Sequence, residues 1–382
     1  MSVPGFVASG LACGIKESGA PDLALVATAD GRPVPAAAVF TTNLAPAAPV
    51  QVSRAHLAAT GGYASAVVIN SGNANAATGA AGREHAERMC AVVAEGIGCR
   101  PEEVLVCSTG LIGIPLPFAA VESGIPPLVG ARAVDGFAAA AVGMMTTDTG
   151  PKDVLHRGDG FGVRGIAKGA AMLAPHMATM LAVLATDAAL SPEELHAALT
   201  AAVADSFNAL SVDGATSTND TVIALAGGSA GARPGVGGVL ADVCAELATL
   251  MADGAEGATK RARIRIRGAA SADDARRAAR KVAESQLVQC SLYGGDPYWG
   301  RIVSELGSSG AAFDPDKVCI AYGTVEVCRG GVAADHDPAE AKAALAGREV
   351  EITADLGLGE GAAIVTTTDL TPEYIAENMR TS

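Results

Sequence analysis

The chain has 382 residues, with a formal net charge of −14, 49% hydrophobic residues and 18% charged residues. This negative charge argues against a broad cationic footprint, which makes nucleic acid and anionic membranes poor partners and favours a small-molecule ligand. The high apolar fraction excludes a disordered chain and predicts a compact protein with a large core.

The start of the chain and its apolar runs bear on its location. The N-terminus, MSVPGFVASGLACGIKESG, lacks the basic residues and the following apolar core of a secretory signal. The apolar run at residues 177–185 is about half of the roughly 18 residues that a membrane span needs, and it contains Thr179. We therefore expect a cytoplasmic protein.

Cysteine and histidine spacing argues against metal and disulfide sites. The 8 cysteines include no C-x-x-C pair, and the 6 histidines include no H-x-x-x-H or H-E-x-x-H spacing. We expect neither a metal site nor a disulfide framework, and we interpret the cysteines as small, reduced core residues.

In the first half of the chain, short β-rich runs alternate with a helical pattern. The predicted strands are Leu23–Thr28, Ala38–Thr41, Ala66–Asn70 and Val104–Cys107. We expect the last two to end in small polar turns, NSGNANAATG (70–79) and STG (108–110), which would present backbone donors. Between these turns, Arg83–Gly96 has the spacing of an amphipathic helix that ends at glycine.

The stretch KGAAMLAPHMATMLAVLATDA (168–188) places the hydroxyl of Thr179 within an apolar run. An unpaired buried hydroxyl costs roughly 1 to 3 kcal/mol. Thr179 is therefore either a strand threonine bonded to a neighbour or a functional hydroxyl. The run by itself leaves both interpretations open.

In the second half of the chain, helix caps and alternating strands are the main signals. Ser191-Pro192-Glu193-Glu194 is a capping box that opens a helix through about Ala204, and Ser271–Asp274 begins another helix. We expect Ala226–Gly238 to be a Gly-rich loop. The predicted late strands are Ala262–Arg267, with its arginines on the solvated face, Val318–Val327 and Val350–Ala354.

Many strands with helices between them predict an α/β or α+β fold in layers, with sheets covered by helices. The Gly-rich stretches GDGFGVRG (158–165) and GLGEG (357–361) do not fit G-x-G-x-x-G, and G-x-x-x-x-G-K-[ST] does not occur. We therefore interpret these residues as turn glycines, and we expect no cofactor.

Several stretches follow one another in an order that resembles the ornithine acetyltransferases, also called bifunctional arginine-biosynthesis acetyltransferases. They are NSGNANAATG (70–79), STG (108–110), MTTDT (145–149), KGAAMLAPHMATML (168–181), SVDGATSTNDT (211–221), AEGATK (255–260) and DPYWGR (296–301). The resemblance spans nearly the whole chain and implies a layered α-β-β-α sandwich. It also implies self-cleavage between Ala178 and Thr179 into an α chain (1–178) and a β chain (179–382), which form an intertwined heterodimer that associates further.

The implied activity is that of a glutamate N-acetyltransferase that moves acetyl from N2-acetylornithine to glutamate through an acetyl-threonine intermediate. By resemblance, Thr179 is the nucleophile. Cleavage frees its α-amine, whose unperturbed pKa of about 7.7 to 8.0 suits a base. The hydroxyl of Thr109 and the backbone N–H of Gly110 are the implied oxyanion donors. With the other motifs present, the nucleophile interpretation of Thr179 outweighs the core-threonine one.

The resemblance also assigns substrate contacts whose side chains suit an amino-acid ligand. They are Thr146, Lys168, Thr179, Glu256, Asn378 and Ser382. Thr147 stays an alternative to Thr146, which we favour. The chain departs from the family at Ala171, where glycine is usual, and its tail after Asn378 is one residue shorter than usual.

Two further questions concern the donor and the reaction class. Some members of that family also use acetyl-coenzyme A as a donor, although this chain lacks the Arg/Gln-rich pyrophosphate loop of the common acetyl-coenzyme A acetyltransferases. The other functions that we consider are a related aminopeptidase, in which water resolves the acyl-enzyme, and an uncleaved protein that binds a small molecule.

Overall fold

The computed structural model describes residues 2–172 and 180–379, which divide into two compact units. The first unit holds the described residues up to Asn208 together with Ala215–Met251, and the second holds Ala209–Gly214 together with residues 252–379. The expected cleavage point lies outside the described residues, so the predicted division into chains stays a prediction.

The first unit contains a 4-stranded sheet in the order β1-β2-β5-β6 and a 6-stranded sheet in the order β4-β3-β10-β9-β8-β7. The smaller sheet consists of β1 (Phe6–Leu11), β2 (Leu23–Thr28), β5 (Ala66–Asn73) and β6 (Val104–Leu111). The larger sheet consists of β3 (Val34–Phe40), β4 (Tyr63–Ala64), β7 (Lys152–Gly158), β8 (Phe161–Lys168), β9 (Leu181–Ala189) and β10 (Thr221–Ala232). The described α-helices are α1 (Ala48–Thr60), α2 (Gly79–Ile97), α3 (Phe118–Gly130), α4 (Phe137–Gly143), α5 (Pro192–Ala204) and α6 (Val236–Asp253), with short 3₁₀ helices at Pro101–Glu103 and Phe207–Ala209.

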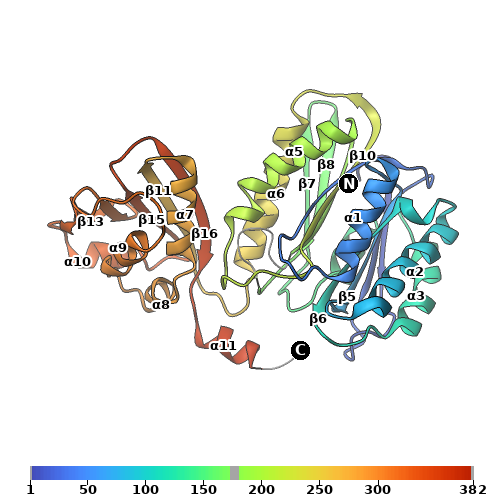
Figure 1. The fold of residues 1–382 in the computed structure, drawn as a ribbon, viewed down its shortest axis with the longest axis horizontal. Coiled ribbons are helices and arrows are strands. Elements are labelled where there is room, and N and C mark those ends of the chain that lie inside the picture. The colour runs from blue at the N-terminus through green and yellow to red at the C-terminus, as the bar shows by residue number, and fades with distance from the viewer. Residues whose placement is uncertain (1, 173–179, 380–382) are drawn as a thin grey trace. The chain divides into compact units, whose positions relative to one another are not determined.

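Alternating side chains along the strands separate two apolar layers in this unit. In β2, Leu23 and Leu25 belong to the buried cluster that includes residues of α2 and α3, whereas Ala24 and Val26 belong to the cluster between the two sheets. Helix α4 contributes Phe137 to this inner cluster, α1 packs on β6, and α5 packs on β3. The unit is therefore an α-β-β-α sandwich (Figure 1), and the predicted layered fold class is confirmed.

The second unit is built on a 6-stranded sheet in the order β14-β13-β12-β15-β11-β16. Its strands are β11 (Arg261–Ala269), β12 (Cys319–Tyr322), β13 (Val325–Arg329), β14 (Val332–Ala333), β15 (Glu349–Asp355) and β16 (Gly361–Thr368). Its described helices are α7 (Ala272–Ala283), α8 (Gln286–Gly294), α9 (Gly300–Gly307), α10 (Pro338–Ala343) and α11 (Pro372–Asn378). Helix α7 packs on β11 and β16, and α9 packs on α7.

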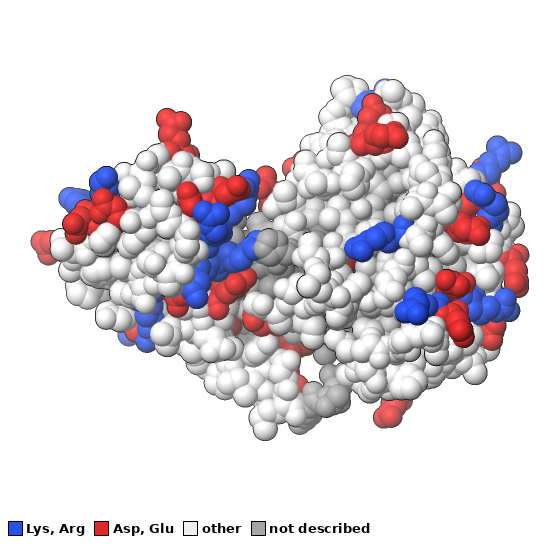
Figure 2. Space-filling view, in the orientation of Figure 1, with Lys and Arg blue, Asp and Glu red and all other residues white. Residues whose placement is uncertain are grey.

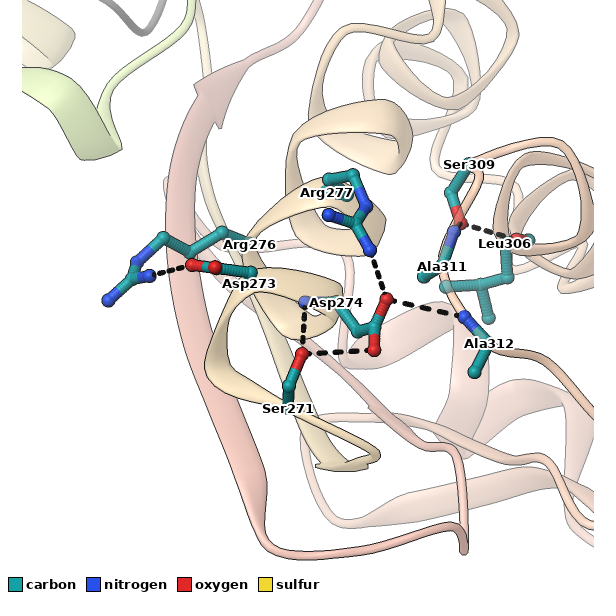
Figure 3. Close-up of polar contacts among 9 residues, drawn as sticks. All are labelled: Ser271, Asp273, Asp274, Arg276, Arg277, Leu306, Ser309, Ala311 and Ala312. Carbon is teal, nitrogen blue, oxygen red and sulfur yellow. Dashed lines mark hydrogen bonds and ion pairs between the residues drawn. The ribbon is translucent and has the colours of Figure 1, made fainter.

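Helix α7 begins at the predicted cap. The Oγ of Ser271 accepts a hydrogen bond from the N–H of Asp274 at 3.0 Å and donates one to the Asp274 carboxylate at 3.0 Å. Asp274 also pairs with Arg277 and accepts a hydrogen bond from the N–H of Ala312 at 3.4 Å (Figure 3). These contacts satisfy the N–H of Asp274 in the first turn and fasten that turn to the segment that follows α9.

The arginines of β11 lie on a solvated face, as predicted. Arg265 pairs with Glu351 at 3.2 Å and Arg267 pairs with Asp355 at 2.9 Å, whereas Ile264 is buried on the opposite face. On the face of the molecule that Figure 2 shows, basic and acidic side chains are intermingled. The arginines of β11 therefore lie among acidic partners on the exposed face of the strand and do not form a cationic patch.

The strand prediction for Val318–Val327 is wrong, because this segment forms the hairpin of β12 and β13. The chain turns at Gly323, which has a φ of 57°. The apolar alternation changes phase at this point, because Tyr322 and Val325 are three residues apart, and this shift marks the turn.

The loop prediction for Ala226–Gly238 is also wrong. Strand β10 continues to Ala232 and α6 starts at Val236, which leaves a short connection. The pairing of β10 with β9 shifts between Ala226 and Gly231, and Gly231 has a φ of 75°. The glycines therefore serve a bulge within a strand, which periodicity does not distinguish from a loop.

Residues 2–172 and 180–379 contain neither a membrane-spanning helix nor a metal cluster. No helix in this part of the chain combines the length and the apolar character that crossing a bilayer requires. Within the same residues, no cluster of His, Cys, Asp and Glu side chains is arranged to hold a metal ion.

Candidate active site

The predicted oxyanion donors lie within a strand and not in a turn after it, which corrects the expected strand ends. Strand β6 continues through Gly110, which pairs with Gly72 of β5. Gly110 has a φ of 129°, and a Cβ placed on it would lie 2.3 Å from the backbone carbon of Gly72. Only glycine fits here, because a side chain would meet backbone atoms that cannot move away.

A buried polar network fixes the neighbouring residues. Thr109 is 2% exposed, and Ser71 is its partner in the parallel pairing of β5 and β6. The hydroxyl of Ser108 donates a hydrogen bond to Oδ1 of Asn70 at 2.5 Å, and Nδ2 of Asn70 donates one to the carbonyl of Asn73 at 2.8 Å. The NSGNAN and STG motifs thus form one network at the ends of β5 and β6.

The second group of predicted residues lies in the larger sheet, where β8 ends and where β9 and β10 begin. Lys168, the last residue of β8, pairs with Leu181 of β9, and Leu181 pairs with Thr221 of β10. The expected cleavage residues Ala178 and Thr179 lie outside the described residues. Met180 is described, so the structure places the residue that follows Thr179 directly before β9.

Asn219 and Asp220 join the ends of the two sheets. Nδ2 of Asn219 donates hydrogen bonds to the carbonyls of Ala74 at 2.6 Å and Ser108 at 2.8 Å. Oδ1 of Asp220 accepts the N–H of Met180 at 2.8 Å. One dipeptide therefore holds both the residue before Thr109 and the residue after Thr179.

Asp220 is fully buried, and in the described part of the chain its Oδ2 has no hydrogen-bond partner. Burial raises the pKa of this carboxyl well above its usual range, although the N–H of Met180 and the charge of Lys168 act in the opposite direction. The fold therefore favours a neutral carboxyl beside the start of β9.

Asp148 of the MTTDT motif connects two of the predicted substrate contacts. It accepts hydrogen bonds from the N–H of Thr146 at 3.0 Å and the N–H of Gly169 at 2.8 Å, and it pairs with Lys152 at 2.5 Å. Burial alone would raise the pKa of Asp148, but the ammonium groups of Lys168 and Lys152 and the hydrogen bonds together lower it to about 2. An ionised, buried carboxylate thus fixes the segment of Thr146 and the end of β8.

In the second unit, the predicted contacts Glu256 and Asn378 lie together. Nδ2 of Asn378 donates hydrogen bonds to Oε2 of Glu256 at 2.7 Å and to the carbonyl of Tyr374 at 2.9 Å. The hydroxyl of Tyr374 donates one to Asp213 at 3.2 Å. Burial, followed by the charge of Asp213, raises the pKa of Tyr374. Helix α11 therefore positions Asn378 on Glu256.

The two departures from the family pattern differ in outcome. Ala171 is described and does not have a positive φ, so the backbone there does not demand glycine; the positive φ falls on Met172, at 55°. Ser382 lies outside the described residues, and its predicted contact stays a prediction.

Several residues that hold this site have no role predicted from the sequence. They are Lys16, Asp148, Lys152, Asn219 and Asp220. Asp148, Asn219 and Asp220 stand inside motifs that were recognised, MTTDT and SVDGATSTNDT, so the signal was present. An Asp or Asn beside a threonine of such a motif is therefore a candidate for a buried residue that holds the site.

The chain is similar to known proteins over almost its whole length. A family model described as the ArgJ family matches residues 7–381. The arginine biosynthesis bifunctional protein ArgJ of Thermobifida fusca is 45% identical over 377 residues, which cover 98% of this chain and 97% of that protein. The protein of the same name from Geobacter sulfurreducens is 44% identical over 396 residues, which cover 99% of each.

Solved structures match smaller parts of the chain. The arginine biosynthesis bifunctional protein argJ of Bacillus halodurans is 32% identical, with a TM-score of 0.49, and the match covers 50% of this chain and 95% of that one. An ornithine acetyltransferase of Mycobacterium tuberculosis, complexed with ornithine, is 42% identical, with a TM-score of 0.43, and the match covers 45% of this chain and 92% of that one.

Proposed function

The chain belongs to the ArgJ family, and on that premise we propose that it transfers acetyl from N2-acetyl-L-ornithine to L-glutamate. It is an acyltransferase of arginine biosynthesis that acts on small amino-acid substrates. The observation that carries this conclusion is the family match over residues 7–381, which includes every stretch that predicted the activity.

The chemistry that we propose uses Thr179 as the nucleophile after cleavage at Ala178. Its amine takes the hydroxyl proton as Oγ bonds to the acetyl carbon, and the carbon–nitrogen bond of acetylornithine then breaks. The same proton passes to the leaving amine of ornithine. Glutamate reverses these steps: its amine attacks the acetyl-threonine and loses a proton to the threonine amine, which passes that proton to Oγ as the Oγ–carbon bond breaks.

We propose that Thr109 and Gly110 stabilise the negative oxygen in both half-reactions. The burial of Thr109 and the close pairing of Gly110 with Gly72 support this role, because a donor that is already fixed needs no reorganisation during the reaction. Loss of one such donor typically lowers kcat by about a hundred- to a thousand-fold.

We propose that Thr146 and Lys168 bind the substrate carboxylate, and that Glu256, Asn378 and Ser382 make the remaining polar contacts. The buried Lys168 lies close enough for its charge to act on Asp148, which supports a fixed position for this ammonium. The hydrogen bond between Asn378 and Glu256 supports a joint role for these two residues.

The reaction needs no cofactor, because a threonine, its amine and fixed donors supply each required group. Acetyl-coenzyme A enters this scheme only as a second donor substrate. Incubation with labelled acetyl-coenzyme A as the sole donor, with glutamate as acceptor, tests that use.

The proposed reaction is tested with acetyl-labelled acetylornithine. Initial rates against both substrates should give the parallel double-reciprocal lines of a ping-pong mechanism, and donor alone should leave one acetyl group on Thr179. Intersecting lines without product would exclude the shared intermediate. Release of labelled acetate in water at the rate of transfer to glutamate would instead indicate a hydrolase.

A further inference from the structure

Lys16 lies on a loop between β1 and β2 that the fold holds in place. The carboxylate of Asp22 accepts hydrogen bonds from the N–H groups of Cys13 at 2.6 Å, Ile15 at 2.7 Å and Lys16 at 3.1 Å. This arrangement wraps the loop around one buried carboxylate. The backbone of Lys16 is therefore fixed before its side chain makes any contact.

The stem of Lys16 covers the strand pair that carries the oxyanion donors. A Cβ placed on Gly72 would lie 3.2 Å from Cγ of Lys16. Gly72 is the pairing partner of Gly110. The loop thus crosses β5 at the residue that lies beside the proposed oxyanion donor.

The ammonium of Lys16 reaches the segment of Thr146. Its Nζ donates hydrogen bonds to the carbonyls of Pro21 at 2.6 Å and Met145 at 2.8 Å. Met145 directly precedes Thr146. An ammonium has three donors, and these two carbonyls use two of them. Within residues 2–172 and 180–379 no group takes the third donor, which can therefore bind a ligand.

Charges of both signs act on Lys16. Burial lowers the pKa of Lys16, the carboxylates of Asp22 and Asp148 act in the opposite direction, and Lys168 lowers the pKa further. Asp148 is already paired with Lys152, and Asp22 accepts the backbone N–H groups of the loop. The ammonium of Lys16 therefore lies within electrostatic reach of Lys168, and it contacts the residue before Thr146.

We propose that Lys16 is a second substrate-binding cation, which binds the α-carboxylate of the amino-acid substrates together with Lys168. The inference rests on the proposed function. The α-carboxylate is the anionic group that the donor and the acceptor share, so a fixed pair of cations serves both half-reactions without discriminating between their side chains.

The test compares N2-acetylornithine with its α-carboxamide in the wild type and in Lys16→Met. The wild type should prefer the carboxylate in kcat/KM, and Lys16→Met should reduce this preference by about ten- to a hundred-fold, the usual value of a hydrogen bond to a charged partner. Most of the change should be in KM, and the KM for glutamate should rise as well. Lys16→Arg keeps a charge and should restore part of the preference.

Lys16→Met also removes the hydrogen bonds to Pro21 and Met145. A second variant therefore distinguishes the loss of substrate binding from a change in the loop. Lys16→Gln can still donate to those carbonyls but carries no charge, and it should lose the carboxylate preference too. If either folded variant lowers the rates for carboxylate and carboxamide by the same factor, Lys16 only holds the loop, and the inference is wrong.

The control is Lys317→Met, because Lys317 pairs on the surface with Asp314 at 3.5 Å and its side chain is 54% exposed. This variant should keep the full preference. A wild type that does not transfer acetyl to glutamate would overturn the proposed function. An active wild type whose Lys16 variants keep the full preference would overturn this inference alone.

Discussion

Asp148 is a single residue on which several others depend, since its buried carboxylate holds Thr146, Lys152 and Gly169. Its side chain is 0% exposed and that of Lys152 is 4% exposed. Asp148→Asn leaves a buried ammonium without a counter-charge, which should lower the free energy of unfolding by about 3 to 5 kcal/mol. Adding Lys152→Met should recover part of this loss.

Urea unfolding in a Thr179→Ala background measures the effect on a single chain. The control is Asp30→Asn, because Asp30 pairs with Arg32 at 3.9 Å on the surface, where about 0 to 1 kcal/mol is expected. Equal losses for the buried and the surface variant would contradict the role given to Asp148.

The same carboxylate predicts a pH dependence. The folded state holds the pKa of Asp148 at about 2, below the value of about 3.9 expected for an unfolded chain. Between these values the folded state binds fewer protons, so this contribution to stability is complete above about pH 4 and is lost as the pH falls towards 2. The difference in unfolding free energy between wild type and Asp148→Asn should therefore shrink over this window. A constant difference from pH 5 to pH 2 would contradict it.

At the residue scale, motif resemblance named site residues whose roles stay predictions, and it did not specify which contacts they make. It named Glu256 and Asn378, 122 residues apart in sequence, and the structure joins them by a hydrogen bond. It did not reveal Asp148 and Lys152 as a buried pair, because a spacing of four residues is just as typical of a solvated surface pair. Burial depends on how loops pack, and a local pattern does not specify that.

At the scale of elements, Asn219 sets how β6 lies relative to β9 and β10. Asn219→Asp keeps the shape but replaces the amide that donates to Ala74 and Ser108 with an oxygen that repels their carbonyls. Strand β6, which carries Thr109 and Gly110, should shift. Because small misplacements of catalytic groups strongly reduce the rate, kcat should fall by about a hundred-fold with a smaller change in KM.

Steady-state kinetics of the folded variant check this expectation. The control is Asn43→Asp, since Nδ2 of Asn43 donates a single exposed hydrogen bond to Thr216 at 3.1 Å. That variant should keep the wild-type kcat. A folded Asn219→Asp enzyme with wild-type kcat would show that β6 does not depend on this contact.

Elements with strong local signals were predicted well. Strand β2 has the predicted bounds Leu23–Thr28, and α5 begins at Pro192 after the Ser191 cap, as its capping box indicates. The hairpin of β12 and β13 was missed because the turn at Gly323 shifts the apolar alternation by only one position between Tyr322 and Val325. Local chemistry thus specifies where an element starts more reliably than where a strand folds back.

At the scale of the whole molecule, the principal prediction is processing. Purified protein should run as an α chain of residues 1–178 and a β chain of residues 179–382, and Edman sequencing of the β chain should begin Thr-Met-Leu-Ala-Val. Thr179→Ala should stay a single chain of 37.8 kDa, because it has no hydroxyl to attack the preceding carbonyl. Light scattering should give a native mass of more than one αβ pair. Wild-type protein that is intact and fully active would contradict the proposed mechanism.

The strand order β4-β3-β10-β9-β8-β7 gives such a cut an unusual consequence. Strands β3, β4, β7 and β8 precede residue 178 and β9 and β10 follow residue 179, so the later segment lies between two parts of the earlier one. The sheet must therefore form before cleavage, while the chain is still a single polypeptide. After the cut, a denatured molecule would have to reassemble from two separate pieces, in a reaction that slows with dilution. The cleaved enzyme would then be stable in the kinetic sense. Its lifetime would depend on the rate at which the interleaved sheet unfolds, and not on an equilibrium with refolding.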